Sequence, residues 1–251
     1  MAEWKKDLKI IATIEARMTS SRLPGKVLLQ AAGKPMLEHL VNRLRAVPSL
    51  HGIVLATTTN RTDDIIEEFS MRMGIACYRG SENDVMTRVI GAAESAKADV
   101  VVEITGDCPI IDPEIVEQTI HLFNASQVDY VSNDHIKSFP DGMNTQVFRL
   151  DTLKRSATMT SDALDHEHVT LHIRNHPEIF KSVHLVAPPE LRWPELGLTL
   201  DEPKDYELLK MIIEYFEPNQ TPFSCLDVIK LLRHRPDWVS INQSVIRKGD
   251  E

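Results

Sequence analysis

Basic side chains gather directly after the first apolar run of the chain. The run KIIATIEAR, residues 9–17, is typical of a β-strand, and the compact loop RMTSSRLPGK follows it to Lys26. The positive charges are Arg17, Arg22 and Lys26, with Lys34 shortly after. Backbone N–H groups of a loop with Ser and Gly, together with guanidinium forks, suit a polyphosphate. The cluster predicts a nucleoside triphosphate site, whereas a solvated basic turn would explain any one of these residues alone.

Two acidic positions would complement this basic loop. Asp107 follows an apolar run and a glycine in EITGDCP, and Asp201 ends the run LGLTL. Mg²⁺ typically takes one or two protein carboxylates besides phosphate oxygens and waters, so Asp107 and Asp201 are candidate ligands. Each has a structural alternative, a loop turn or helix cap for Asp107 and the N-cap of the following helix for Asp201. For the helix that begins at Pro113, Asp112 is the better-placed cap.

Composition excludes several classes of protein. With 251 residues, 42% of them hydrophobic and 26% charged, the chain fits one large α/β domain or a domain with an appended lobe. A net charge of −9 argues against a general nucleic-acid binder. Three widely spaced cysteines without a CxxC pattern favour a reducing cytoplasm over a disulfide framework or zinc site. We see neither a signal peptide nor an apolar stretch long enough to insert into a membrane.

Apolar runs alternate with amphipathic segments over the first half of the chain. We expect strands at 9–17, 52–57, 75–78 and 99–105, and helices at 33–47, 63–74, 81–96 and 113–124, the third of them with Ser81 as its N-cap. This alternation predicts an α/β fold with a mostly parallel sheet and helices on both faces. Such sheets bind ligands beyond the carboxyl ends of their strands, where both the basic loop and Asp107 lie.

The second half is less regular. We expect extended segments at 129–133, 182–187 and 196–200, a turn at Pro140–Gly142, and helices after Pro203 and over 224–235. We interpret the chain, 1–251, as a single domain in which residues 129–189 form an inserted lobe for the second substrate.

Seven blocks, in order, resemble one family of enzymes. They are IEARMTSSRLPGKVLLQAAGKPMLEHLVNRL, RGSENDVMTRVIGAA, VVEITGDCPIIDPEIVE, DYVSND, FPDGMNTQVF, EHVTLHIRNHPEIF and LTLDEPKDYELLK. Together they resemble the cytidylyltransferases that make CMP-activated acidic sugars such as CMP-Kdo and CMP-acylneuraminate, most closely the branch of the spore coat polysaccharide protein F. The resemblance implies a nucleotide-diphospho-sugar transferase-like (Rossmann-like) fold. It also implies an Mg²⁺-dependent reaction that releases pyrophosphate, and a homodimer formed through the inserted lobe.

The resemblance also assigns roles to single residues. Positions that bind the triphosphate in the family are matched by Arg17, Ser21, Arg22 and Lys26, and its metal-binding aspartates by Asp107 and Asp201. Arg22, Lys26 and the two aspartates would be the catalytic residues, and Ala16 and Ser20 complete the phosphate loop. Two features depart from the pattern: Glu15 replaces Gln or Pro, and Thr19-Ser20-Ser21-Arg22 replaces the commoner Gly-Ser-Thr-Arg. In addition, Thr105 replaces the Gln of the Kdo-activating relatives.

The remaining candidates follow from strand ends and from motifs in the second half. For the nucleobase we expect residues that follow the second and third strands: Thr57, Thr58, Asn60, Arg79, Ser81 and Asp84. Arg88 could pair with Asp84 on the surface, one helical turn away. For the acceptor we expect Asp141, Glu167, His168 and Arg174, with a surface histidine as the alternative for His168. Cys108 is better explained as a buried structural cysteine than as a nucleophile.

Three functions compete. The first is transfer of CMP from CTP to an acidic sugar, with CTP and the sugar as the partners. The second is a nucleotidyltransferase that activates a sugar phosphate or a phosphonate with CTP or another nucleotide. The third is a regulatory protein that binds nucleotide without turnover, against which the intact Arg22, Lys26, Asp107 and Asp201 argue. The acceptor sugar is not specified by the sequence.

Overall fold

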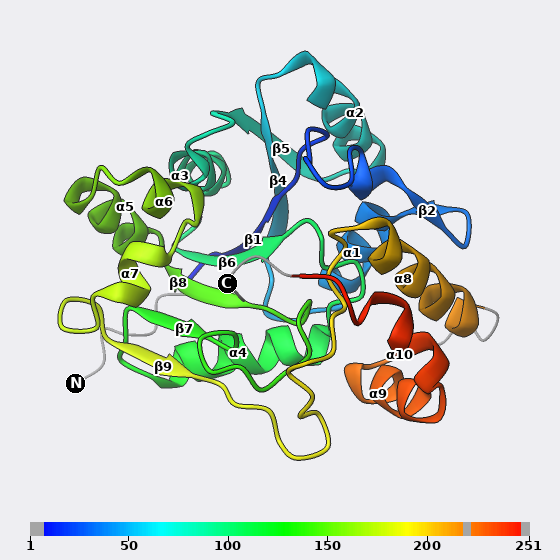
Figure 1. Cartoon of the computed structure of the whole chain (residues 1–251). Coiled ribbons are helices and arrows are strands. Elements are labelled where there is room, and N and C mark those ends of the chain that lie inside the picture. The colour runs from blue at the N-terminus through cyan, green and yellow to red at the C-terminus, as the bar shows by residue number, and fades with distance from the viewer. Residues whose placement is uncertain (1–7, 218–221, 247–251) are drawn as a thin grey trace.

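Seven strands form one sheet at the centre of the molecule (Figure 1). The computed structural model describes residues 8–217 and 222–246. The strand order is β5-β4-β1-β6-β8-β7-β9, and only the pairs that involve β8 are antiparallel. The strands are β1 (Ile10–Glu15), β4 (Gly52–Thr58), β5 (Ala76–Gly80), β6 (Val100–Thr105), β7 (Tyr130–Ser132), β8 (Gln146–Arg149) and β9 (Ser182–His184). The predicted mostly parallel sheet is therefore confirmed.

Helices cover both faces of this sheet (Figure 1). One face packs against α1 (Met36–Leu44), α2 (Asp64–Met73) and α4 (Pro113–Ala125), and the other against α3 (Val85–Ser95), α5 (Leu150–Met159) and α7 (Leu171–Asn175). Because side chains alternate along a strand, Ala12 and Ile14 of β1 pack in the core on the α1, α2 and α4 side, and Ile11 packs in the core on the α3, α5 and α7 side. The central strands are buried on both sides, which explains their continuous apolar runs.

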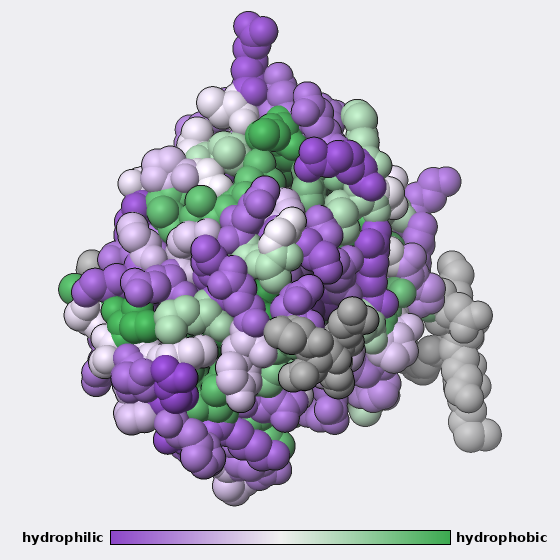
Figure 2. Space-filling model, turned by 90° about the vertical axis from the view of Figure 1, so that its right-hand side faces the viewer, coloured by the Kyte–Doolittle hydropathy of each residue, from purple (hydrophilic) through white to green (hydrophobic). Residues whose placement is uncertain are grey.

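A separate core lies beside the sheet. It is built from α8 (Pro203–Phe216), α9 (Cys225–His234) and α10 (Pro236–Asn242), which pack on the extended segment 196–200. The side of the molecule that carries these helices is mostly hydrophilic, with hydrophobic side chains in small separate groups (Figure 2). Within the described part of the chain, no helix combines the length and the apolarity that spanning a membrane requires.

Several local predictions need correction. The N-cap of α3 is Asp84, whose carboxylate accepts the Thr87 N–H at 2.9 Å, so Ser81 lies before the helix rather than at its cap. Sequence reasoning also missed the hairpin of β2 (Gln30–Ala31) and β3 (Lys34–Pro35), the short 3-10 helices η1 (Lys26–Leu28) and η2 (Arg61–Asp63), and the helices α5, α6 (Ala163–Glu167), α7 and α10. The segment 129–189 contributes β7, β8 and β9 to the main sheet.

The order in which strands are added to the sheet reverses between β1 and β6, which are themselves parallel. Strands β4 and β5 extend the sheet on one side of β1, and β6 begins the other side. In open α/β sheets such a switch point opens a crevice for ligands at the carboxyl ends of the strands. The loop after β1 carries the basic residues and the loop after β6 carries Asp107, so the topology brings both halves of the predicted site to one place.

Gly106 allows these two loops to approach closely. Its N–H donates to the Glu15 carbonyl oxygen at 2.9 Å, and a Cβ added at Gly106 would lie 2.6 Å from that oxygen. Because backbone cannot yield as a side chain can, we expect Gly106→Ala to lower the free energy of unfolding by about 1–3 kcal/mol, measured by denaturant unfolding. Gly52→Ala is the matched control, since its Cβ would meet only the Ile11 side chain, at 3.3 Å. Equal effects of the two substitutions would contradict this explanation.

Candidate active site

Lys26 links the two predicted acidic residues. Its Nζ lies 2.9 Å from Asp107 Oδ2 and 3.1 Å from Asp201 Oδ1, and all three side chains are at least three-quarters buried. Burial alone would lower the pKa of Lys26, but the two carboxylates outweigh it and raise that pKa above its ordinary value. For Asp107, burial would raise the pKa, and Lys26 reverses this and holds it below its usual range. The structure therefore brings together three residues that are each at least 81 positions from the others in the chain.

Arg22 adds a second cation on the far side of Asp201. Its Nη2 lies 2.8 Å from Asp201 Oδ1, and its Nη1 lies 3.8 Å from Glu202 Oε1. The same Nη1 donates to the carbonyl oxygen of Ile246 at 3.0 Å, so the end of the described chain reaches this loop. Two cations and two carboxylates thus share one small, partly buried volume.

The segment before α8 delivers Asp201 to the site. The Leu200 N–H donates to the Asp107 carbonyl oxygen at 2.8 Å, which ties this segment to the loop after β6. The N-cap of α8 is Glu202, in a capping box with Asp205, and the Asp201 N–H donates to the Asp205 carboxylate. The alternative role of Asp201 as the helix N-cap is therefore wrong, and its side chain is directed at Lys26 and Arg22.

Two buried or bridging carboxylates shape the basic loop. Asp63 is fully buried, accepts the Met18 N–H at 2.8 Å and accepts the hydroxyl of Thr58. Glu82 accepts Thr19 Oγ1 and Asn60 Nδ2, each at 2.6 Å. Sequence reasoning missed both, because each acts across loops that are distant in the chain.

Glu82 also contacts two residues that are predicted to bind the nucleotide. Arg17 Nη1 lies 3.3 Å from its Oε1, so Arg17 and Asn60 meet at one carboxylate. Hydrogen bonds from Thr19 and Asn60, and the charge of Arg17, lower the pKa of Glu82. Within the same loop Ala16 is buried, Ser20 is half-buried and Ser21 is exposed.

Arg79 braces the end of β5 against α2. Its guanidinium lies 2.7 Å from Asp64 and 2.9 Å from Glu67, and it donates to the carbonyl oxygens of Thr58 and Asn60 at 2.9 and 2.8 Å. With these partners, Arg79 holds the loop after β4 in place and is not a free cation for a nucleotide. Its effect on the site is therefore through the position of Asn60.

The other predicted base-binding residues lie around the start of α3. Thr57 is fully buried, and Ser81 Oγ accepts the Asp84 N–H at 3.0 Å. Besides capping α3, Asp84 lies 2.9 Å from His166 Nδ1. Arg88 does not pair with Asp84 on the surface: it is 97% buried and donates to the carbonyl oxygens of Ser81 and Glu82.

The four predicted acceptor residues separate in the structure. Asp141 accepts Asn144 Nδ2 at 2.9 Å and forms an isolated β-bridge with Gly197, near the segment that carries Asp201. Glu167 and His168 are exposed at the end of α6. The exposure of His168 agrees with the alternative that it is a surface histidine. Arg174, on α7, lies near Glu103 of β6, on the sheet face covered by α3 and α5.

Glu15 and Glu103 form a buried carboxyl pair that the sequence only hinted at. They lie on the same face of neighbouring strands, since Thr13 pairs with Glu103 and Glu15 pairs with Thr105. The two carboxyls lie near each other, and both oxygens of Glu15 are buried without a hydrogen-bond partner among the described residues. Burial and the neighbouring carboxyls raise the pKa of Glu103 to about 7 and that of Glu15 well above its usual range. A charged residue inside the run VVVEIT was the signal available in the sequence.

Cys108 is a structural residue. It is fully buried, and burial raises the pKa of its thiol well above the ordinary value. The thiol is therefore protonated near neutral pH and is not a nucleophile.

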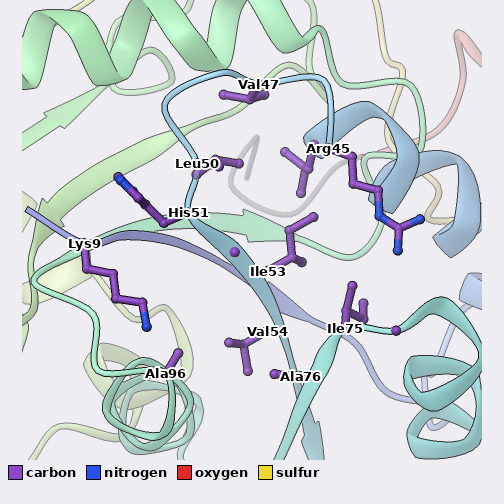
Figure 3. Close-up of a pocket in the computed structure, with 13 residues that line it drawn as sticks. Lys9, Arg45, Val47, Leu50, His51, Ile53, Val54, Ile75, Ala76 and Ala96 are labelled. Carbon is purple, nitrogen blue, oxygen red and sulfur yellow. The ribbon is translucent and has the colours of Figure 1, made fainter.

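One well-defined cavity lies away from the basic loop. Its volume is about 500 Å³, and it lies at the amino ends of the parallel strands, opposite the loop (Figure 3). Apolar side chains such as Ile53, Val54 and Ile75 line it, and Lys9 and Arg45 lie apart on its two sides. Nothing there matches the paired cations and carboxylates around Lys26.

The fold and the paired basic and acidic groups define a nucleotidyltransferase. A family model described as cytidylyltransferase matches residues 11–234. The chain belongs to the cytidylyltransferase family.

Similar proteins agree with this assignment. The spore coat polysaccharide biosynthesis protein SpsF of Bacillus subtilis is 35% identical over 91% of this chain and 95% of its own. A solved cytidylyltransferase from Leptospira borgpetersenii is 31% identical, with a TM-score of 0.88 over 96% of this chain and 100% of its own. An 8-amino-3,8-dideoxy-manno-octulosonate cytidylyltransferase from Shewanella amazonensis is 35% identical over 46% of this chain and 48% of its own.

Proposed function

We propose that this cytidylyltransferase transfers CMP from CTP to an acidic sugar and releases pyrophosphate, for the synthesis of a surface glycan. The observation that carries the proposal is Lys26 between Asp107 and Asp201, with Arg22 against Asp201. Cations for the phosphates and carboxylates for a metal stand in one partly buried volume. The names of the SpsF and 8-amino-3,8-dideoxy-manno-octulosonate relatives support an acidic sugar of a polysaccharide pathway as the acceptor.

The two carboxylates fit Mg²⁺. Each is an oxygen donor, and a single ammonium group already contacts both, so one small cation can lie between them. No cluster of three or more metal-ligating side chains occurs in residues 8–217 and 222–246, which suits a metal that completes its shell with phosphate oxygens and water. When bound to Asp107 and Asp201, Mg²⁺ would supply charge neutralisation at the α-phosphate.

The chain's own residues then have defined roles. An acceptor oxygen forms a bond to the α-phosphorus of CTP, and the bond from that phosphorus to the oxygen bridging to the β-phosphate breaks, while the acceptor proton passes to solvent. Lys26 and Arg22 stabilise the charge that develops on the departing pyrophosphate. Arg17 and Asn60, held by Glu82, position the nucleotide at the end of β4.

The apolar surface of the segment 129–189 supports a homodimer. Five of the nine large hydrophobic side chains exposed among the described residues lie in this segment: Ile136, Met159, Leu164, Ile179 and Val186. Where exposed apolar side chains form one contiguous patch, they are typical of a protein contact. The free cysteines Cys77, Cys108 and Cys225 fit a reducing cytoplasm.

Pyrophosphate release tests the proposed function. The wild-type protein is mixed with CTP, Mg²⁺ and each of several acceptors: acidic sugars, sugar phosphates and phosphonates. Release that depends on an acidic sugar supports the proposal. Release only with a sugar phosphate or phosphonate would show that this compound, and not an acidic sugar, is the acceptor. CTP binding measured by calorimetry without release from any acceptor would identify a non-catalytic nucleotide-binding protein.

Lys26 is expected to compete with the metal in the nucleotide-free protein. Since its ammonium contacts both carboxylates, Lys26→Met removes the competing charge, and we expect Mn²⁺, a probe for Mg²⁺, to bind about tenfold more tightly, as measured by electron paramagnetic resonance. CTP binding should weaken in the same variant. Lys34→Met, in the exposed hairpin, is the control. Unchanged Mn²⁺ binding in Lys26→Met would remove these carboxylates from the metal site.

A further inference from the structure

A row of polar side chains crosses the sheet face that is covered by α3 and α5. The strand register places one residue from each of five adjacent strands in this row: Thr13, Glu103, Gln146, Ser132 and His184. Elsewhere this face is apolar, with Ile11, Val101 and Phe148 in its core. Burying polar groups in an otherwise apolar layer costs free energy unless each group finds a partner.

Gln146 organises the middle of the row. Its Oε1 accepts the Tyr130 hydroxyl at 2.6 Å and the Thr170 hydroxyl, and its Nε2 donates to Glu103 Oε2. Tyr130 and Thr170 are fully buried, and Glu103 is 96% buried. The amide is thereby fixed, and it holds one side of the Glu103 carboxyl.

The protein does not complete the hydrogen bonds around this centre. Six buried atoms around this centre have no partner among the described residues: both carboxyl oxygens of Glu15, Oδ1 of Asp134, Oγ1 of Thr13, Nε of Arg88 and Nε of Arg174. Asp134 and Arg174 both lie near enough to Glu103 to act on its charge. Three carboxyl oxygens and three donors therefore lack partners, and a polar ligand with hydroxyl groups, which both donate and accept, would complete them.

The charges around the centre agree with such a ligand. Glu103 lies near Glu15 and Asp134, with the Arg174 cation also close to it. Arg88 approaches Glu15 from α3, but its Nη1 is engaged by the Ser81 and Glu82 carbonyl oxygens. Hydroxyl groups, or a protonated amino group, would satisfy these carboxyls better than a second anion.

The position of the pair links it to the reaction. Glu15 precedes Ala16 and Arg17 of the phosphate loop, and Glu103 lies on the strand that ends in the Asp107 loop. The main-chain bond from Gly106 to Glu15 joins the two strand ends. A ligand seated on the pair would lie beside the carboxylates that we assign to the metal.

We propose that Glu15 and Glu103, supported by Gln146 and with Arg174 beside them, recognise hydrogen-bond donor groups of the acceptor other than its reacting oxygen. This inference rests on the proposed function, because it assumes an acceptor beside CTP. The shared chemistry is a donor, from either a hydroxyl or an amino group, and the two carboxyls are specificity-determining residues for the second substrate.

The test compares two acceptors that differ at one position. These are 3-deoxy-manno-octulosonate and 8-amino-3,8-dideoxy-manno-octulosonate, in which an amino group replaces the hydroxyl at carbon 8. Pyrophosphate release is measured against acceptor and CTP concentration for the wild type, Glu15→Gln and Glu103→Gln. The control is Glu117→Gln, on α4, whose carboxylate binds Ser49 on the other side of the molecule.

We expect the acceptor KM to rise about ten- to hundredfold in both variants, the range for a buried polar group that loses its hydrogen-bond partner, while the KM for CTP stays unchanged. A larger rise for the amino acceptor would identify an ammonium group as the donor, and equal rises would identify a hydroxyl. The control should match the wild type. An unchanged acceptor KM in both variants would overturn the inference.

A second measurement separates this inference from the proposed function. Difference infrared spectroscopy follows the C=O stretching band of the protonated carboxyl pair when each acceptor is added to the CTP-bound wild type. If no pyrophosphate is released but the band shifts, and the shift is lost in Glu15→Gln, the site is correct and the proposed reaction is wrong. Absence of a band shift with both acceptors, together with absence of turnover, would also overturn the inference.

Discussion

Asp107→Asn is expected to lower turnover of CTP by about three orders of magnitude while the chain stays folded. Asp107 contacts Lys26 at 2.9 Å and is one of two carboxylates assigned to the metal. Asp107 would act by holding the metal, and loss of a group that stabilises transition-state charge in a partly buried site typically costs about 10²–10³-fold in kcat. The substituted amide can still accept a hydrogen bond from Lys26, and Asp201 still balances its charge. The readout is pyrophosphate release at saturating CTP, with thermal unfolding to check the fold.

Asp99→Asn is the matched control for that experiment. Asp99 immediately precedes β6, whose other end leads to Asp107, and its carboxylate accepts the Lys9 N–H at 2.8 Å. It lies at the opposite end of the strand, so the substitution tests the fold without touching the site. We expect near-normal turnover in the control. Near-normal turnover in Asp107→Asn would remove Asp107 from the metal and from catalysis.

Local patterns predicted the strand ends and the residues just beyond them. Arg22, Lys26, Asp107 and Asp201 each follow or adjoin an apolar run, and parallel strands bring their carboxyl ends to one edge. Their meeting in the structure follows from strand order, which the alternation of strands and helices already restricts. This half of the site was therefore accessible from the sequence.

Contacts between distant loops were not accessible in the same way. Glu82 joins Thr19 and Asn60, which are 63 and 22 positions away, and neither spacing is a helix or strand period. Arg79 is another case: the sequence predicts it as a nucleotide ligand at a strand end, and only the structure shows that Asp64 and Glu67 on α2 pair with it. A sequence shows that a residue is charged, but only the packed structure shows which neighbouring group forms an ion pair with it.

The second substrate's half of the site was the hardest to predict. Glu103 and Gln146 meet because β8 pairs antiparallel with β6, and the register decides which side chains share a face. The short helices α5 to α7 supply Thr170 and Arg174 without a long apolar period. Arg174 was chosen from its motif, and its neighbour Glu103 was left unassigned.

Glu103→Gln is expected to stabilise the folded protein at alkaline pH. Glu103 has its pKa raised from 4.5 to about 7 in the folded chain by burial and nearby carboxyls, and Glu15 is raised in the same direction. The folded protein therefore binds more protons than the unfolded chain, so this contribution to stability is complete below about pH 4.5 and is lost as pH rises through about 7. For Glu103 the loss is on the order of 3 kcal/mol. An uncharged amide has no such loss, and it removes one charge that disfavours ionised Glu15.

Denaturant unfolding of the wild type and Glu103→Gln, from about pH 5 to about pH 9, measures this difference. His166, whose pKa is raised by Asp84, and His184, whose pKa is lowered by burial, titrate in the same interval in both proteins, so they cancel when the two curves are subtracted. Glu117→Gln, the remote control, should keep the wild-type slope. If Glu103→Gln is no more stable than the wild type at the alkaline end, the carboxyl pair does not hold its proton. If it is more stable, the protein keeps a costly buried carboxyl pair, as expected where a site trades stability for recognition of a substrate.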